Sequence, residues 1–173
     1  MNQPVPEPVD PSNVTRLATD VVASDRFPVL ASIDKQTPRV RPVSPVKTEG
    51  FTVWVANLKS YHKTQEIAAN PNVELCYINQ NHDQVRITGI AHIESHEETI
   101  EAIWNSNPLL KHYLGSPDNP LLIIYRIEPT QVRYMKEWAL EYHNVPLLAL
   151  PTFPAHLPAC VPSEHVLHPT YKY

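Results

Sequence analysis

Glycine is scarce in this chain of 173 residues, which contains only Gly50, Gly89 and Gly115. The dinucleotide-binding fingerprint and the phosphate-binding P-loop both need several glycines within a few residues, because their backbones approach phosphate groups closely. The three glycines here are far apart in the sequence. Both of these nucleotide-binding motifs are therefore excluded.

Cysteine and long apolar runs are also limited. Cys76 and Cys160 are the only cysteines, which is too few for a disulfide framework. Cys76 sits in the strand-like run VELCYI and is predicted to be a small core residue. No segment approaches the roughly 20 apolar residues that a membrane helix needs, and the opening MNQPVPEPVDPSN lacks the apolar region of a signal peptide. These features favour a cytoplasmic protein that does not enter a membrane.

The net charge is −4, which argues against a general affinity for nucleic acids. Proline, by contrast, is abundant at 19 residues and is concentrated at the two ends of the chain. We therefore predict a disordered lead-in over residues 1–11 and one folded domain over residues 12–140. Residues 141–173 form a proline-rich tail whose leucines and Phe153 are too apolar to stay in water. This tail is expected to cover the domain or a second subunit.

Hydrophobic periodicity predicts mainly β structure with some helix. A first helix starts at Ser12 or Asn13, and a second spans residues 60–69. Two short helices broken at Pro108 are expected within residues 95–115. The predicted strands are residues 27–34, 39–46, 51–57, 73–79, 84–94 and 121–138. Most of these strands are joined by hairpins, with residues 47–50 read as one hairpin loop, so the pattern favours an antiparallel β-barrel with flanking helices.

Two of these strands carry residues that disturb a regular ladder. Pro42 and Pro45 cannot donate hydrogen bonds, so strand 39–46 should lie at an edge, contain a bulge or run beside a ligand. Gly89, in the middle of strand 84–94, predicts a bulge or a close approach of two backbones.

Basic residues are concentrated between positions 35 and 65. This segment contains six lysines and arginines and only one acidic residue, Glu49. The cations are Lys35, Arg39, Arg41, Lys47, Lys59 and Lys63. A solvated surface is the simple explanation. However, Lys63 and Ser60 stand at a predicted helix start, where free backbone N–H groups favour an anion. Arg41, from a neighbouring strand, could hold the same anion, and a phosphate group fits this set of donors.

The segment between Arg41 and Lys47 adds a second feature. Its prolines leave backbone N–H and C=O groups outside a regular ladder, so a flat ring with polar edges could pair with them. A phosphate at one end and such a ring along a strand together describe a phosphorylated flavin.

The run PRVRPVSPVKTEGFTVWVANLKSYHKTQEIAANPNVELCYINQNHDQVRITGIAHI, residues 38–93, resembles the FMN-binding split barrel of pyridoxamine 5′-phosphate oxidase and its relatives. These relatives include general-stress-type flavoproteins. The resemblance extends from about Ser12 to Trp138. Its most specific parts are the Arg-x-Val start of strand 39–46, the Ser-x-x-Lys helix entry that ends in ANPNV, and QVRITG.

This resemblance implies an antiparallel split β-barrel that is homodimeric and binds FMN in the groove between subunits. Arg41 and Lys63 would hold the FMN phosphate, and Ser60 and His62 would line the same pocket. The other implied contacts are backbone groups of Val43, Ser44 and Val46, the Lys47 side chain near the ring, Trp54 and Val55 beside the flavin, and Gln84 from a later strand. The partner subunit would then complete each site.

The chain also departs from the oxidase. The spacing from Arg41 to Lys47 is one residue longer, and no arginine follows Arg133, so the Arg-x-His pair that grips the oxidase substrate is missing. We therefore expect an FMN-dependent oxidoreductase that does not oxidise vitamin B6, with an unknown small-molecule substrate. The alternatives are a non-catalytic flavin-binding module for sensing, stress or scavenging, or the same fold with deazaflavin or haem. The histidine pairs at 92 and 96 and at 165 and 168 do not predict a metal site.

Overall fold

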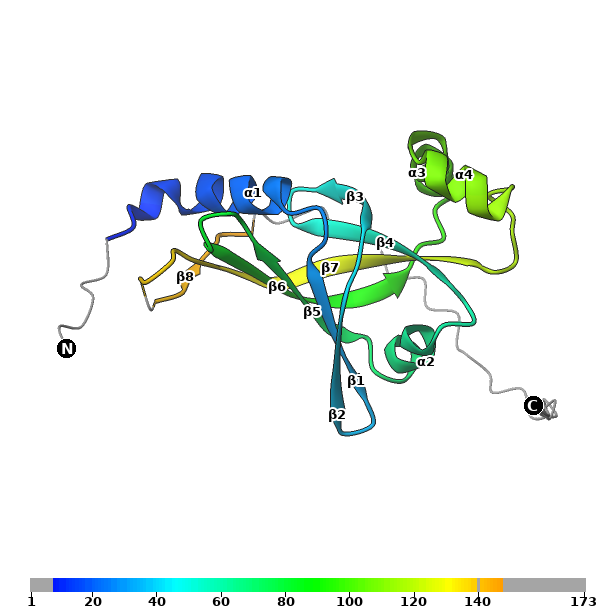
Figure 1. Ribbon diagram of the computed structural model, residues 1–173, viewed down its shortest axis with the longest axis horizontal. Coiled ribbons are helices and arrows are strands. Elements are labelled where there is room, and N and C mark those ends of the chain that lie inside the picture. Colours follow the sequence, from blue (N-terminus) through cyan, green and yellow to red (C-terminus); the bar gives the residue numbers. More distant parts are fainter. Residues whose placement is uncertain (1–7, 140, 148–173) are drawn as a thin grey trace.

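The computed structural model describes residues 8–139 and 141–147 (Figure 1). The helices are η1 (Pro11–Asn13), α1 (Val14–Ser24), α2 (His62–Ala69), α3 (Glu97–Ser106) and α4 (Pro108–Leu114). The strands are β1 (Val29–Asp34), β2 (Thr37–Pro42), β3 (Pro45–Glu49), β4 (Thr52–Leu58), β5 (Asn72–Ile78), β6 (Gln84–Ile93), β7 (Leu122–Met135) and β8 (His143–Asn144).

The strands form one antiparallel sheet in the order β2-β1-β5-β6-β7-β4-β3, with β8 paired to β7. The two strands at its ends, β2 and β3, are consecutive in the sequence and are separated only by Val43 and Ser44. This short connection brings the two edges together, so the sheet curls into a split barrel flanked by helices. The predicted fold class is confirmed.

The barrel interior is built by alternation along the strands. Buried residues on β6 and β7 include Val85, Ile87, Val132 and Tyr134, and each has a more exposed neighbour on either side. The apolar stripe of α1, which consists of Val14, Ala18, Val21 and Val22, packs on the same core. A second, smaller apolar cluster lies between β4, β7 and α3 and contains Trp54, Ile103 and Ile124.

Gly89 marks a bulge between β6 and β7, as predicted. The strand register shifts between Thr88 and Gly89. A Cβ atom at position 89 would lie 2.5 Å from the backbone oxygen of Glu128, which is closer than non-bonded atoms can approach. Only glycine therefore allows the two backbones to come together here.

The predicted strand 39–46 is wrong in one respect, because it is two strands that lie at opposite edges of the sheet. β2 pairs with β1, the chain leaves the ladder at Val43 and Ser44, and β3 pairs with β4. The expected edge position and irregularity are confirmed, with a register shift between Pro45 and Lys47. The predicted hairpin loop 47–50 is also shorter than expected. Glu49 pairs with Thr52, so the turn consists of Gly50, with φ of 57°, and Phe51.

The core prediction for Cys76 is wrong. The side chains of Val73, Leu75 and Tyr77 are buried, and the half-buried Cys76 alternates with them on the other face of β5. The lead-in before residue 8 and the tail from residue 148 lie outside the described residues. No helix in the described part of the chain is long and apolar enough to cross a membrane.

Candidate functional site

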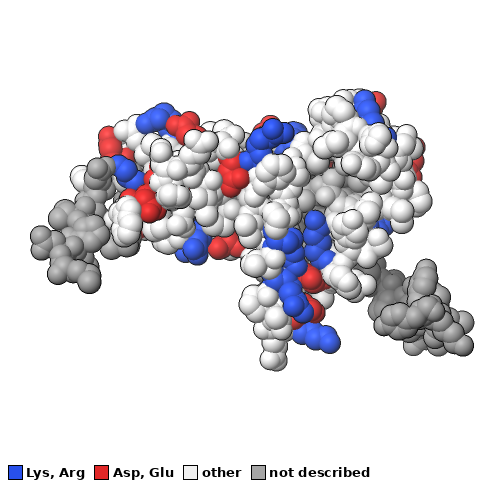
Figure 2. All heavy atoms as spheres, viewed as in Figure 1, with Lys and Arg blue, Asp and Glu red and all other residues white. Residues whose placement is uncertain are grey.

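A pocket of about 470 Å³ lies between the end of β2 and the start of α2. Its lining residues are Arg41, Pro42, Ser60, Tyr61, His62, Lys63 and Glu66. Figure 2 shows lysine and arginine side chains gathered where the β1–β2 hairpin faces α2. The structure thus brings together the four residues that were predicted from the sequence to surround the phosphate: Arg41, Ser60, His62 and Lys63. We call these four residues the phosphate corner.

Local hydrogen bonds hold the chain at this corner. Thr64 Oγ1 donates to the carbonyl oxygen of Leu58 and accepts a hydrogen bond from Asn57 Nδ2. The backbone N–H of Tyr61 also donates to Leu58. No side chain caps the start of α2, since Tyr61 at the N-cap position makes no capping bond. The N–H of Thr64 donates to the Tyr61 carbonyl oxygen, which leaves the N–H groups of His62 and Lys63, at the start of α2, available to an anion.

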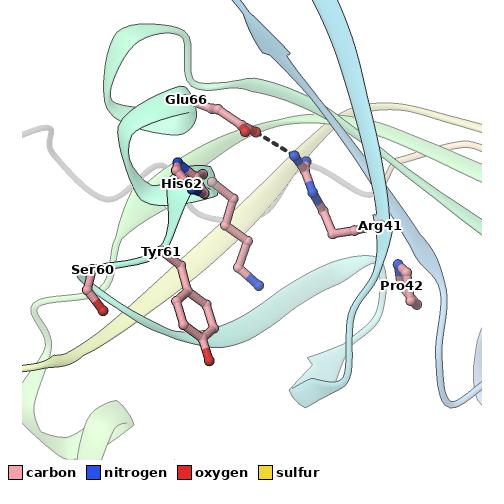
Figure 3. A pocket seen from close by; sticks show the side chains of 7 residues that line it. Arg41, Pro42, Ser60, Tyr61, His62 and Glu66 are labelled. Carbon is pink, nitrogen blue, oxygen red and sulfur yellow. Dashed lines mark hydrogen bonds and ion pairs between the residues drawn. The ribbon is translucent and has the colours of Figure 1, made fainter. Parts of the chain in front are cut away.

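Arg41 and Glu66 form an ion pair on one wall of the pocket (Figure 3). Arg41 Nη2 lies 2.6 Å from Glu66 Oε2, and the Glu66 side chain is only 9% exposed. Ser32, which is buried, donates to Glu66 and accepts from Arg41. Glu66 therefore neutralises much of the Arg41 charge and holds the guanidinium in place.

Lys63 differs from Arg41, because its ammonium makes no hydrogen bond or ion pair within the described residues. Burial lowers the pKa of Lys63, and the nearby Arg41 charge lowers it further, while Glu66 opposes this shift in part. A half-buried ammonium without a partner is unfavourable. An anion in the pocket would supply the missing partner.

Other predicted site residues lie away from this pocket lining. The side chains of Val43 and Val55 are buried in the barrel core. Those of Trp54 and Val46 belong to the second cluster beneath α3, and the Val46 carbonyl oxygen accepts a hydrogen bond from Asn107. Ser44 is exposed in the connection between β2 and β3. The proposed backbone contacts of Val43, Ser44 and Val46 with a flavin ring stay predictions.

Lys47 interacts with its own strand and with β4. Its ammonium lies 4.5 Å from the centre of the Trp54 ring and 3.1 Å from a carboxylate oxygen of Glu49. The Trp54 ring is also held by a hydrogen bond, since its Nε1–H donates to the Glu94 carboxylate at 2.8 Å. An approach of Lys47 to a flavin ring stays a prediction.

Gln84 is not among the residues that line this pocket. It pairs with Ile78 at the start of β6, and its side chain accepts a hydrogen bond from the Tyr142 hydroxyl. A contact of Gln84 with a flavin or its ribityl chain stays a prediction.

Sequence reasoning missed Glu66, Tyr61 and the supporting Ser32. The available signal for Glu66 was its position three residues after Lys63, which places both side chains on one face of α2. No local signal could identify Ser32, because it reaches Glu66 across 34 positions of sequence. No group of three or more potential metal ligands occurs among the described residues.

Two features define the class of protein to which this chain belongs. They are the antiparallel split barrel and the pocket at the start of α2, which is lined by Arg41 and Lys63. Residues 14–136 match the pyridoxamine 5′-phosphate oxidase family, and the chain is a member of that family. A curated relative is general stress protein 26 of Bacillus subtilis, 29% identical over 127 residues, which cover 71% of this chain and 89% of the relative.

Solved structures show the same fold. General stress protein 26 from Bacillus anthracis has a TM-score of 0.63 and 23% identity, covering 76% of this chain and 98% of its own. An FMN-binding protein from Nostoc punctiforme, related to pyridoxamine 5′-phosphate oxidase, has a TM-score of 0.57 and 13% identity, with coverage of 70% and 80%. A haem-binding protein from Mycobacterium smegmatis has a TM-score of 0.64 and 13% identity, with coverage of 80% and 59%.

Proposed function

We propose that this protein is an FMN-binding flavoprotein and that the FMN phosphate binds at the corner formed by Lys63, Ser60 and the start of α2. The observation that carries the proposal is the half-buried Lys63 ammonium, which has no partner in the described part of the chain and lines a pocket. The family membership supports this choice of ligand.

The residues present suit a phosphate group. Lys63 offers an ammonium that has no ion-pair partner among the described residues, Ser60 offers a hydroxyl, and His62 and Lys63 offer backbone N–H groups at the start of α2. Arg41 contributes through its remaining N–H groups, because Nη1 and Nη2 already donate to Ser32 and Glu66. The pocket volume of about 470 Å³ lies in the range of small-molecule sites.

FMN supplies hydride or electron transfer when bound, so an oxidoreductase activity follows as part of the proposal. The protein would bind the cofactor phosphate, orient the ring and exclude water. The absence of arginine after Arg133 supports a substrate other than the phosphorylated vitamin B6 of the oxidase. A homodimer with FMN between the subunits is proposed with this function.

Haem is the second candidate for this chain. His62 lines the pocket beside Lys63, and a histidine next to a cation suits an iron ligand and a propionate carboxylate. The haem-binding structural neighbour supports the same possibility. A non-catalytic flavin-binding module and a phosphorylated deazaflavin are compatible with the same corner.

The test is a visible absorption spectrum of the freshly purified protein, with mass identification of any molecule released by heat. Flavin absorption and the mass of FMN support the proposal. A Soret band identifies haem, and a deazaflavin mass identifies that cofactor. A colourless protein that does not bind added FMN would show that the proposal is wrong. Turnover is then tested by following NAD(P)H oxidation with a panel of acceptors, and its absence favours the non-catalytic module.

A further inference from the structure

Two arginines face each other across neighbouring strands on the outer side of the sheet. Arg86 on β6 and Arg133 on β7 are directly opposite in the strand register. Each lies between two buried residues of its own strand, so both side chains point away from the barrel core. Like charges directly opposite each other repel and destabilise a sheet. This arginine pair therefore needs negative charge close to it.

One carboxylate serves both arginines. Glu74, on the adjacent strand β5, lies 3.8 Å from Arg86 Nη1 through Oε1 and 3.2 Å from Arg133 Nη2 through Oε2. The Thr88 hydroxyl donates a hydrogen bond to the same carboxylate and helps to hold it. Among the described residues, no other acid forms an ion pair with either arginine. With two guanidinium groups and one carboxylate, the cluster carries one excess positive charge.

The Cys76 thiol does not balance this charge. Cys76 pairs with Arg86 across β5 and β6, but burial raises the pKa of its thiol, so the thiol is neutral at physiological pH. Asp25 also acts on this thiol, but its carboxylate accepts hydrogen bonds from the backbone N–H groups of Phe27 and Ile78. The excess charge on the arginine pair is therefore left to solvent or to a ligand.

Tyr142 covers part of the arginine pair. Its ring centre lies 5.2 Å from the guanidinium carbon of each arginine, and its hydroxyl donates to Gln84. An aromatic ring attracts a cation but supplies no full negative charge. The Nε atoms of Arg86 and Arg133 are buried and have no hydrogen-bond partner among the described residues, which is unfavourable. The two side chains are nevertheless 38% and 29% exposed, so part of each is accessible to a ligand.

We propose that Arg86 and Arg133 form a binding site for the carboxylate of a small organic acid. The single negative charge of a carboxylate matches the excess charge of the cluster. Guanidinium groups fit carboxylate oxygens in a fork geometry, and the Cβ atoms of directly opposite residues lie about 5 Å apart, so one carboxylate can bridge the pair. The Tyr142 ring offers an apolar flank to the rest of the acid. This site shares no residue with the lining of the pocket at α2.

The test is a titration of the full-length, cofactor-free protein with sodium benzoate, with sodium chloride of equal ionic strength as the reference. NMR follows the ¹H–¹⁵N signals of the arginine Nε–H groups, which are assigned from their loss in Arg86→Met and Arg133→Met. We expect benzoate to shift both signals to saturation and chloride to leave them in place. Inorganic phosphate, which carries more negative charge, should bind more weakly than benzoate.

Each methionine variant should bind benzoate at least about 10-fold more weakly than the wild type, measured on the arginine that remains. Arg133→Lys keeps the charge but loses the fork, so its affinity should lie between those of the wild type and Arg133→Met. Arg16→Met is the matched control, because Arg16 forms an exposed ion pair with Asp20 on α1, and it should bind like the wild type. Circular dichroism confirms that each variant is folded.

Three results would overturn the proposal. They are wild-type shifts that fail to saturate or that also occur with chloride, unchanged affinity in both methionine variants, and tighter binding of phosphate than of benzoate at the arginine pair. The titration of the wild type alone decides the first result, so the test stands even if a variant does not fold. Because no flavin is added and the signals come from Arg86 and Arg133, the outcome is independent of whether FMN binds near Lys63.

Discussion

Arg41 on β2 and Glu66 on α2 lie 2.6 Å apart, and their ion pair joins the edge of the sheet to the helix that forms the pocket. The pair is well shielded, with 23% of the Arg41 side chain and 9% of the Glu66 side chain exposed. This contact separates the two cations of the pocket into different roles. Arg41 is held by a carboxylate, whereas Lys63 has no ion-pair partner among the described residues and is the cation that we propose binds the ligand.

Glu66→Gln should therefore destabilise the protein. The change leaves a partly buried guanidinium without its counter-charge, and we expect a loss of about 1–3 kcal/mol in the free energy of unfolding. Urea denaturation measures this loss. Glu101→Gln, an exposed position on α3, is the matched control and should change stability by less than about 0.5 kcal/mol. Equal stabilities of the two variants would mean that the Arg41–Glu66 pair contributes nothing to folding.

Lys63→Met should weaken binding of FMN but leave binding of riboflavin nearly unchanged, since riboflavin lacks the phosphate. The expected loss for FMN is about 10- to 100-fold, or about 1.5–3 kcal/mol. Fluorescence titration of both flavins gives the two affinities. Lys59→Met, at an exposed neighbouring position, is the control. An equal loss for both flavins would show that Lys63 does not contact the phosphate.

Lys63→Met should weaken FMN binding but stabilise the protein when no ligand is bound. The ammonium is half-buried and unpaired in the described part of the chain, so its removal should raise the free energy of unfolding by about 0.5–1 kcal/mol. Thermal unfolding of the cofactor-free protein gives this value. A clear destabilisation would indicate that Lys63 has a structural role in α2.

FMN affinity should also depend on alkaline pH through Lys63. Only the charged ammonium attracts the phosphate, and burial with Arg41 lowers the pKa of Lys63 from its ordinary value of 10.5. Affinity should therefore be constant at moderately basic pH and fall as pH rises through this lowered pKa. Lys63→Arg keeps its charge over this range, so its affinity should not fall there. Parallel curves for the wild type and Lys63→Arg would exclude this explanation.

Gly89→Ala should be strongly destabilising, because the new Cβ would lie 2.5 Å from the Glu128 carbonyl oxygen. We expect a loss of about 2–3 kcal/mol from the forced separation of β6 and β7. Gly115→Ala has free space around its Cβ but a φ of 72°, so its loss should be about 1 kcal/mol. Denaturation curves that rank the two variants in the opposite order would contradict the predicted clash.

The elements that the sequence predicted well are those with strong local patterns. The alternation in residues 84–94 and the break at Pro108 are found in β6 and between α3 and α4. Gly89 indicated the bulge by its residue type alone. Three of the four residues at the cationic corner are close in sequence, so the helix start brings them together without help from distant segments.

Other features depend on contacts between distant parts of the chain. The split of residues 39–46 into β2 and β3 follows from barrel closure, which pairs each half with a different strand. The position of Cys76 depends on which face of β5 the barrel core covers.

The sequence by itself determined the antiparallel class, most helices and strands, and the residues available to bind an anion, because periodicity, glycine and proline act over a few neighbouring residues. Only the tertiary structure decided that Glu66 pairs with Arg41, that Lys63 has no ion pair within the described part of the chain, and that the β1–β2 hairpin turns its apolar side outward. The physical reason is that burial and charge pairing are set by whichever distant surface comes to lie against a segment, and local sequence does not encode that surface.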